Sequence, residues 1–85
     1  MAWYLYVVKC CDETLYTGIT TDVSRRLKEH NAQKGAFYTQ NKTPVTLVYQ
    51  EAMANRSQAL KREAAIKRLT REEKLELIGA CQNIR

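Results

Sequence analysis

The sequence predicts an α+β fold, in which a small three-stranded sheet, antiparallel or mixed, is flanked by helices in the order β-β-α-β-α-α. The opening segment, residues 2–10, is rich in Val, Tyr, Trp and Leu and lacks a helix start signal, which is typical of a strand. Two later segments begin with a capping pair and continue in Ala, Leu, Lys and Arg, which is typical of helices. At 85 residues, we expect a single domain over residues 1–85, because a second core would not fit.

The first twenty residues are expected to form a hairpin, with strands over residues 2–10 and 14–19. Alternation gives the first strand two faces, one with Tyr4, Tyr6 and Val8 and the other with Trp3, Leu5 and Val7. An odd-length loop, such as residues 11–13, places Tyr16 on the face of Tyr6, whereas a two-residue loop separates them. Neither Asn-Gly nor Asp-Gly occurs here, which favours the longer loop.

A helix is expected from a cap at Thr21 or Asp22 to about residue 32, because a short side-chain oxygen can accept from the free amides of a first turn. At about 100° per residue, one arc of this helix faces the sheet. Its members are Val23, Arg26, Leu27 and His30. Arg26 is therefore predicted to point inward, one turn before His30, while Arg25 lies outside the arc.

Residues 33–42 are predicted to be a polar, basic loop, followed by a third strand over Val45–Tyr49. Asn55 and Gln58 form a capping-box pattern that opens a helix running through Leu69. Thr70 with Glu73 repeats that pattern and opens a last helix. Three apolar side chains of this last helix are expected to dock on the core, namely Leu75, Leu77 and Ile78.

Glu63 is the out-of-place residue of the Asn55 helix, because the projection puts it within the apolar arc of Leu60, Ala64 and Ile66. A carboxylate that is partly withdrawn from water costs several kcal/mol unless it is paired or holds a metal. The structural interpretation is an ion pair with Lys67, one turn further on. The functional interpretation is a metal ligand.

The net charge of +5 is concentrated in the middle of the chain, since residues 25–71 carry eleven basic and three acidic side chains. Such a concentration is a footprint for nucleic acid, although solvated helix faces give the same composition. Three cysteines, two of them adjacent, suit neither a disulfide framework nor a metal clip. With no apolar run of membrane-spanning length and no signal-peptide pattern, we expect a cytoplasmic protein that does not enter membranes.

Five residues together make a set suited to hydrolysing a phosphodiester with one metal ion: Tyr6, Tyr16, Arg26, His30 and Glu63. One carboxylate can hold Mg²⁺, which keeps most of its waters. Arginine can brace the phosphate as charge builds up in the transition state. A tyrosine or histidine can take a proton from the attacking water, the tyrosine only if its pKa is lowered. Each residue alone has an ordinary structural explanation.

The same residues resemble the GIY-YIG nuclease superfamily. The resemblance rests on Tyr4-Leu5-Tyr6, on Tyr16-Thr17-Gly18 ten residues later, and on Arg26, His30 and Glu63. It extends over about residues 3–78, and the stretches from Leu15 to Asn31 and from Arg56 to Leu69 look like the short stand-alone bacterial branch of that superfamily.

The resemblance implies one-metal hydrolysis of DNA with Mg²⁺ or Mn²⁺. It implies that Tyr16 is the candidate general base, that Tyr6 positions the attacking water, and that Arg26 stabilises the phosphate. Glu63 would bind the metal, and His30 would assist proton transfer or contact the phosphate. Four further cations are the expected phosphate contacts: Lys34, Lys42, Arg56 and Arg62.

The sequence also departs from the family pattern. Tyr4 stands where the name-giving glycine would be, and Thr17 replaces the central isoleucine of the second motif. Leu75 occupies the neighbourhood in which many active members carry an asparagine, and Ile19 and Phe37 replace lysines found in some relatives.

Two functional hypotheses follow. The leading one is a metal-dependent endonuclease acting on DNA, structure-selective or weakly specific, in repair or recombination. The alternative is a nucleic-acid-binding module of the same fold with slow or no turnover, which the missing asparagine and the lack of a recognition domain favour. The sequence names no protein partner.

Overall fold

A computed structural model describes residues 2–32 and 44–82. They form a three-stranded sheet and three helices in the order β1 (Trp3–Lys9), β2 (Leu15–Thr20), α1 (Val23–Asn31), β3 (Thr46–Met53), α2 (Arg56–Lys67) and α3 (Arg71–Gln82). The strand order is β2-β1-β3, and both neighbours of β1 run antiparallel to it. The predicted α+β class and element order are therefore confirmed, and the sheet is antiparallel rather than mixed.

The hairpin loop has the odd length that the sequence favoured. The Cys10 amide donates to the Thr14 carbonyl over 2.8 Å, which leaves residues 11–13 as the loop. The Glu13 amide closes the turn on Cys10, and Glu13 itself has a positive φ of 69°, as three-residue hairpin loops require at that position. This loop pairs Val8 with Tyr16 and Tyr6 with Gly18, so Tyr16 shares a face with Tyr6.

The third strand is longer than the sequence indicated. The predicted Val45–Tyr49 segment continues to Met53, because Gln50, Glu51 and Ala52 pair with the start of β1. Polar and small residues hid this extension, since their β propensity is low. The register shifts by one residue between Val7 and Val8, so Val48 is the extra residue of a β-bulge.

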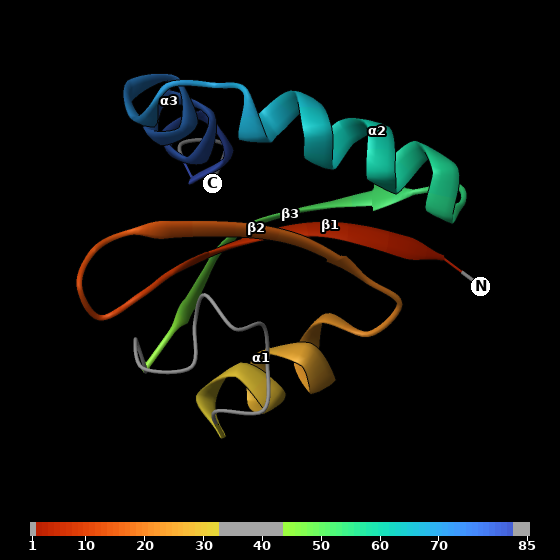
Figure 1. Cartoon of the computed structure of the whole chain (residues 1–85), viewed down its shortest axis with the longest axis horizontal. Coiled ribbons are helices and arrows are strands. Elements are labelled where there is room, and N and C mark those ends of the chain that lie inside the picture. Colours follow the sequence, from red (N-terminus) through yellow and green to blue (C-terminus); the bar gives the residue numbers. More distant parts are fainter. Residues whose placement is uncertain (1, 33–43, 83–85) are drawn as a thin grey trace.

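The helices cover opposite faces of the sheet, with α2 and α3 on one side and α1 on the other (Figure 1). The core toward α2 and α3 contains Leu5, Val7, Ile66 and Ile78. The core toward α1 contains Tyr6, Val8, Cys10 and Val45, with Tyr16, Leu27 and Leu47 packed against it. The alternation predicted for the first strand is confirmed.

The predicted caps are present. Asp22 accepts from the Arg25 amide, Asn55 accepts from the Gln58 amide, and Thr70 and Glu73 accept from each other's amides. The Asn55 box differs in one respect, because the Gln58 side chain accepts from the Ala54 amide. Helix α2 ends at Lys67, two residues before the predicted end at Leu69.

Two apolar residues do not lie where the projection put them. Ile78 is buried and Leu77 packs against the core, but Leu75 is 45% exposed, and Leu60 on α2 is also exposed. Each helix therefore buries a narrower stripe than a full apolar arc. In the part of the chain that the structure describes, no helix has the length and apolar character needed to cross a membrane.

Candidate active site

Three rings from separate elements meet on the α1 face of the sheet. Tyr6 of β1, Tyr16 of β2 and His30 of α1 have ring centroids 5.5 to 6.4 Å apart, in tilted or edge-on arrangements. The Tyr6 hydroxyl and the His30 Nε2 atom lie 3.0 Å apart, at hydrogen-bond distance. His30 is fully buried and Tyr6 is 2% exposed, while Tyr16 is half-buried. Tyr16 is therefore the ring of this cluster that a substrate can reach.

Gly18 makes room for this arrangement. A Cβ atom at Gly18 would lie 2.6 Å from the Tyr6 hydroxyl oxygen and 2.8 Å from its Cζ atom. Tyr6 and Gly18 are direct partners in the β1–β2 ladder, so the phenol lies flat across the strand at the place where a side chain is missing. Close packing, rather than an unusual backbone angle, explains the glycine of the second motif.

Arg26 joins the ring cluster to the surface of α1. Its guanidinium hydrogen-bonds the Tyr6 side chain and forms an ion pair with Glu29 at 3.0 Å. Glu29 was placed outside the inward arc by the helical projection, but it is half-buried through this pair. Arg25 is exposed, so the inward orientation predicted for Arg26 alone is confirmed.

Burial keeps both Tyr6 and His30 in their neutral forms. Desolvation raises the pKa of Tyr6 above its ordinary value near 10, against the opposing effect of its hydrogen bond with Arg26. Desolvation, helped by the positive charge of Arg26, lowers the pKa of His30 below 6.5. At neutral pH Tyr6 is thus a phenol and His30 a neutral imidazole. Arg26 can only donate, so the Tyr6 oxygen accepts from it and the phenolic proton is available to His30 Nε2.

Glu63 approaches the cluster from the other side of the sheet. It lies on α2, its side chain is 19% exposed, and its carboxylate is 3.5 Å from the Lys67 ammonium, as the structural interpretation predicted. Its negative charge is nevertheless close enough to contribute to the raised pKa of Tyr6. Helix α2 contacts both β1 and β2, so the helix that carries Glu63 packs against the two strands that carry Tyr6 and Tyr16.

A single carboxylate suits Mg²⁺ or Mn²⁺ better than a metal that needs a full protein cage. Among residues 2–32 and 44–82, no three His, Cys, Asp or Glu side chains come together as ligands. An ion held at Glu63 would therefore draw its other ligands from water and phosphate, as Mg²⁺ commonly does. It would also replace Lys67 as the partner of the carboxylate.

The proposed phosphate contacts have different surroundings. Arg62 donates to both Glu51 oxygens, over 2.9 to 3.3 Å, so its charge is matched by a carboxylate. Arg56 lies over the Trp3 ring at 5.9 Å and is exposed. Lys34 and Lys42 lie outside the described residues.

Glu51 is a residue that sequence reasoning missed. Its carboxylate accepts hydrogen bonds from Arg62 and from the Tyr49 hydroxyl. Burial, together with the hydrogen bond to Glu51, raises the pKa of Tyr49 to about 12. The hydrogen bonds from Arg62 and Tyr49 lower the pKa of Glu51 despite its burial. The available signal was its position two residues after Tyr49, which puts both on one face once the strand extends past Tyr49.

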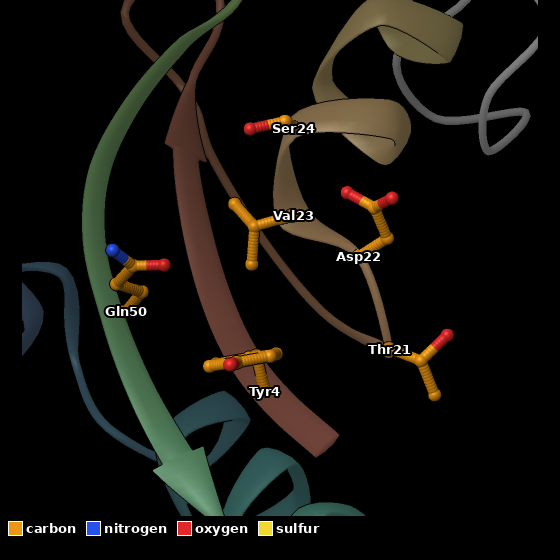
Figure 2. Close-up of a pocket in the computed structure, with 6 residues that line it drawn as sticks. All are labelled: Tyr4, Thr21, Asp22, Val23, Ser24 and Gln50. Atoms are coloured by element: carbon orange, nitrogen blue, oxygen red, sulfur yellow. The ribbon is translucent and has the colours of Figure 1, made fainter. Parts of the chain in front are cut away.

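A hollow of about 330 Å³ lies between β1, β3 and the start of α1 (Figure 2). Its lining residues come from β1, from β3 and from the start of α1: Tyr4, Thr21, Asp22, Val23, Ser24 and Gln50. Gln50 is the β3 partner of Tyr6, so the hollow and the ring cluster lie side by side on one face of the sheet.

A family model described as the GIY-YIG catalytic domain matches residues 2–76. The chain belongs to the GIY-YIG family. The match includes every element from β1 to the first half of α3, so this GIY-YIG domain accounts for nearly the whole chain that we describe.

The chain is also similar to proteins named UPF0213. A UPF0213 protein of Desulfotalea psychrophila is 52% identical over 95% of this chain and 74% of its own length. A UPF0213 protein of Haloquadratum walsbyi is 58% identical over 87% and 83%. The solution structure of a UPF0213 protein from Bacillus halodurans is 40% identical, with a TM-score of 0.62 over 94% of this chain and 85% of that one.

Proposed function

We propose that this GIY-YIG protein is a metal-dependent endonuclease that hydrolyses phosphodiester bonds in DNA. The observation that carries the proposal is the meeting of Tyr6, Tyr16, His30 and Arg26 on one sheet face, within electrostatic reach of Glu63. A structural cluster needs no accessible tyrosine beside an arginine and a carboxylate. Hydrolysis of a phosphodiester uses all three.

The two tyrosines have different roles in this mechanism. Tyr16 is the accessible one and, as the general base, accepts the proton that the attacking water loses. Tyr6 is buried and its pKa is raised, so it stays protonated and positions its neighbours through hydrogen bonds. His30 is fully buried, so we place it behind Tyr6 rather than at the phosphate. His30 acts by holding the Tyr6 hydroxyl.

Arg26 and Glu63 are proposed to stabilise the negative charge of the phosphate. The guanidinium has five donors, of which some are used by Tyr6 and Glu29, and the remaining donors are available to a phosphate oxygen. Glu63 would hold Mg²⁺ or Mn²⁺, which supplies Lewis-acid stabilisation of the phosphate when bound. Because Glu63 pairs with Lys67 at 3.5 Å, that lysine must give way when the ion binds.

The decisive experiment is cleavage by the purified protein with Mg²⁺ or Mn²⁺, tested on single-stranded, duplex, flapped and branched DNA and on RNA. We expect cleavage of at least one DNA form, and its loss in Glu63→Gln and Tyr16→Phe. Salt-sensitive binding should persist in both variants, because phosphate neutralisation elsewhere provides the affinity. Glu72→Gln, an exposed carboxylate on α3, is the matched control and should cut normally.

The alternative is a nucleic-acid-binding module without turnover. One observation favours it: Leu75, in the neighbourhood of the family's late asparagine, is 45% exposed on α3 and supplies no polar group. If no substrate is cut in either metal while DNA is still bound, the nuclease proposal fails and the binding module stands. Activity that survives both Glu63→Gln and Tyr16→Phe would come from a contaminant.

A further inference from the structure

The hollow beside the ring cluster lies where a substrate strand would continue. Tyr4 and Tyr6 are two residues apart on the same face of β1, about 7 Å along the strand. Gln50 is the ladder partner of Tyr6 and therefore a diagonal neighbour of Tyr4. Val23, on the helix side, is one turn before Arg26. A nucleotide whose phosphate lies at Tyr16 and Arg26 thus has this hollow as an immediate neighbour.

The lining of the hollow is polar but carries no cation. Figure 2 shows Tyr4, Val23 and Gln50 approaching one another from β1, α1 and β3, and the Ser24 hydroxyl directed to the strand side. The side chains of Thr21 and Asp22 point the other way, and the Asp22 carboxylate is already engaged by the Arg25 amide at 3.0 Å. What faces the hollow is an aromatic ring, an aliphatic wall, a hydroxyl and an amide.

These groups match one part of a nucleotide. A phosphate needs cations or several amide donors, and the lining residues include no Lys, Arg or His. A flat, neutral group with donors and acceptors on its edge can stack on an aromatic ring and pair with an amide, which both donates and accepts. A volume of about 330 Å³ lies at the lower end of the range for small-molecule sites.

We propose that this hollow, formed by Tyr4, Val23, Ser24 and Gln50, is a binding site for an unpaired nucleobase next to the scissile phosphate. Tyr4 stacks on the base, and Gln50 and Ser24 hydrogen-bond its edge. The base must leave the duplex to enter, so the site selects DNA with unpaired nucleotides at the cleavage position. This inference rests on the proposed function for its placement, but not for its test.

The test measures binding without cleavage, with EDTA present, to short single-stranded oligonucleotides that carry either all their bases or a run of abasic positions. We expect the wild-type protein to bind the abasic oligonucleotide about tenfold more weakly, as the loss of one stacked base predicts. Tyr4→Ala should bind the intact oligonucleotide about tenfold more weakly and should no longer distinguish it from the abasic one. Tyr4→Phe should restore the difference.

Trp3→Ala is the matched control, because Trp3 is the next residue on β1 and belongs to the opposite face of the sheet. It should keep the full preference for the intact oligonucleotide. Gln50→Ala should reduce the differences in affinity among homopolymeric oligonucleotides of different bases, because the Gln50 amide is proposed to hydrogen-bond the edge of the base. Thermal unfolding of each variant shows whether it is folded, and Tyr4→Leu, which removes the ring but keeps an apolar side chain, replaces Tyr4→Ala if that variant does not fold.

The outcomes separate the two proposals. If Tyr4→Ala retains the wild-type preference for intact over abasic DNA, the base site is refuted, whether or not the protein cuts DNA. If Tyr4→Ala loses the preference for intact over abasic DNA but the wild type cuts no DNA in Mg²⁺ or Mn²⁺, the base site is supported and the nuclease proposal is refuted.

Discussion

At the level of single residues, the position of the buried Tyr6 ring depends on a few close contacts, which one added or removed group can disrupt. Tyr6 is fixed by His30 Nε2 at 3.0 Å and by Arg26, and it lies flat over Gly18. Because protein interiors are close-packed, small changes at these residues should displace the ring by amounts that matter for chemistry.

Gly18→Ala should displace the Tyr6 ring, because the new Cβ would lie 2.6 Å from its hydroxyl oxygen. We expect a loss of about 1–3 kcal/mol in the free energy of unfolding and a loss of cleavage of about 100-fold, as misplacement of a reacting group by about 1 Å produces. Urea denaturation and cleavage rates measure the two effects. Gly79→Ala, where nothing lies within 4 Å, should leave cleavage unchanged, and equal effects at both glycines would contradict the steric explanation.

His30→Gln tests the buried imidazole through pH. The pKa of His30 is lowered by burial and by Arg26, opposed by Glu29, so the unfolded chain binds a proton at a higher pH than the folded one. Stability from this group is therefore complete above the unfolded pKa near 6.5 and is lost as the pH falls below it. We expect the Tm of the wild type to fall more steeply between pH 7 and 5 than that of His30→Gln. Parallel Tm profiles would exclude this role.

At the element scale, α2 is attached to the sheet along two different lines. Ala59 and Ile66 are buried against it, and Arg62 and Glu63 lie on either side of that seam, about 100° apart around the helix. Arg62 is tied to Glu51 of β3 by a bidentate pair, while Glu63 acts on Tyr6 at the β2 side. The Arg62–Glu51 pair connects α2 to β3 in addition to the buried seam, and we expect it to help fix the rotation of α2.

Breaking the Arg62–Glu51 pair should change the metal requirement of cleavage more than the stability. We expect Arg62→Ala and Glu51→Gln each to cost about 1 kcal/mol of unfolding free energy, with effects that are not additive in the double variant. The Mg²⁺ concentration for half-maximal cleavage should rise several-fold, because Glu63 is no longer held in place. The control is Glu13→Gln, which breaks the exposed Lys9–Glu13 pair at 3.4 Å. If it changes the Mg²⁺ requirement as much as Arg62→Ala does, the Arg62–Glu51 pair has no special role in holding Glu63.

At the scale of the whole molecule, the net charge of +5 favours association with polyanions such as nucleic acid, but the cations are not equivalent. Arg56 is exposed over Trp3, whereas Arg62 is matched by Glu51. Both were predicted to contact phosphate from sequence alone. The ion pair gives Arg62 a carboxylate partner within the protein, so we expect Arg56 to be the stronger phosphate contact of the two.

Salt dependence of DNA binding should separate the two arginines. Arg56→Ala should reduce the slope of log affinity against log salt by about 1, since one phosphate contact is lost. Arg62→Ala should leave the slope nearly unchanged, because its guanidinium is occupied by a carboxylate. Titrations by fluorescence anisotropy at several salt concentrations measure both slopes, and a larger change for Arg62→Ala would reverse the assignment.

The features that could be predicted from the sequence are those that depend on residues close together in the chain. The two faces of β1, the odd hairpin loop, the caps at Asp22, Asn55 and Thr70, and the inward side of α1 all follow from short-range periodicity and turn chemistry. Together with the favoured odd loop, these features predict that Tyr6, Tyr16, Arg26 and His30 lie on one side of the sheet.

Only the tertiary structure decided how distant segments meet. Each of the following joins residues from different elements: the fit of Tyr6 over Gly18, the full burial of His30, the Glu51–Arg62 pair and the electrostatic effect of Glu63 on Tyr6. Periodicity says which side of an element a residue faces, but it carries no information on which partner covers that side. The physical reason is that these contacts depend on packing between elements, which local propensity does not encode.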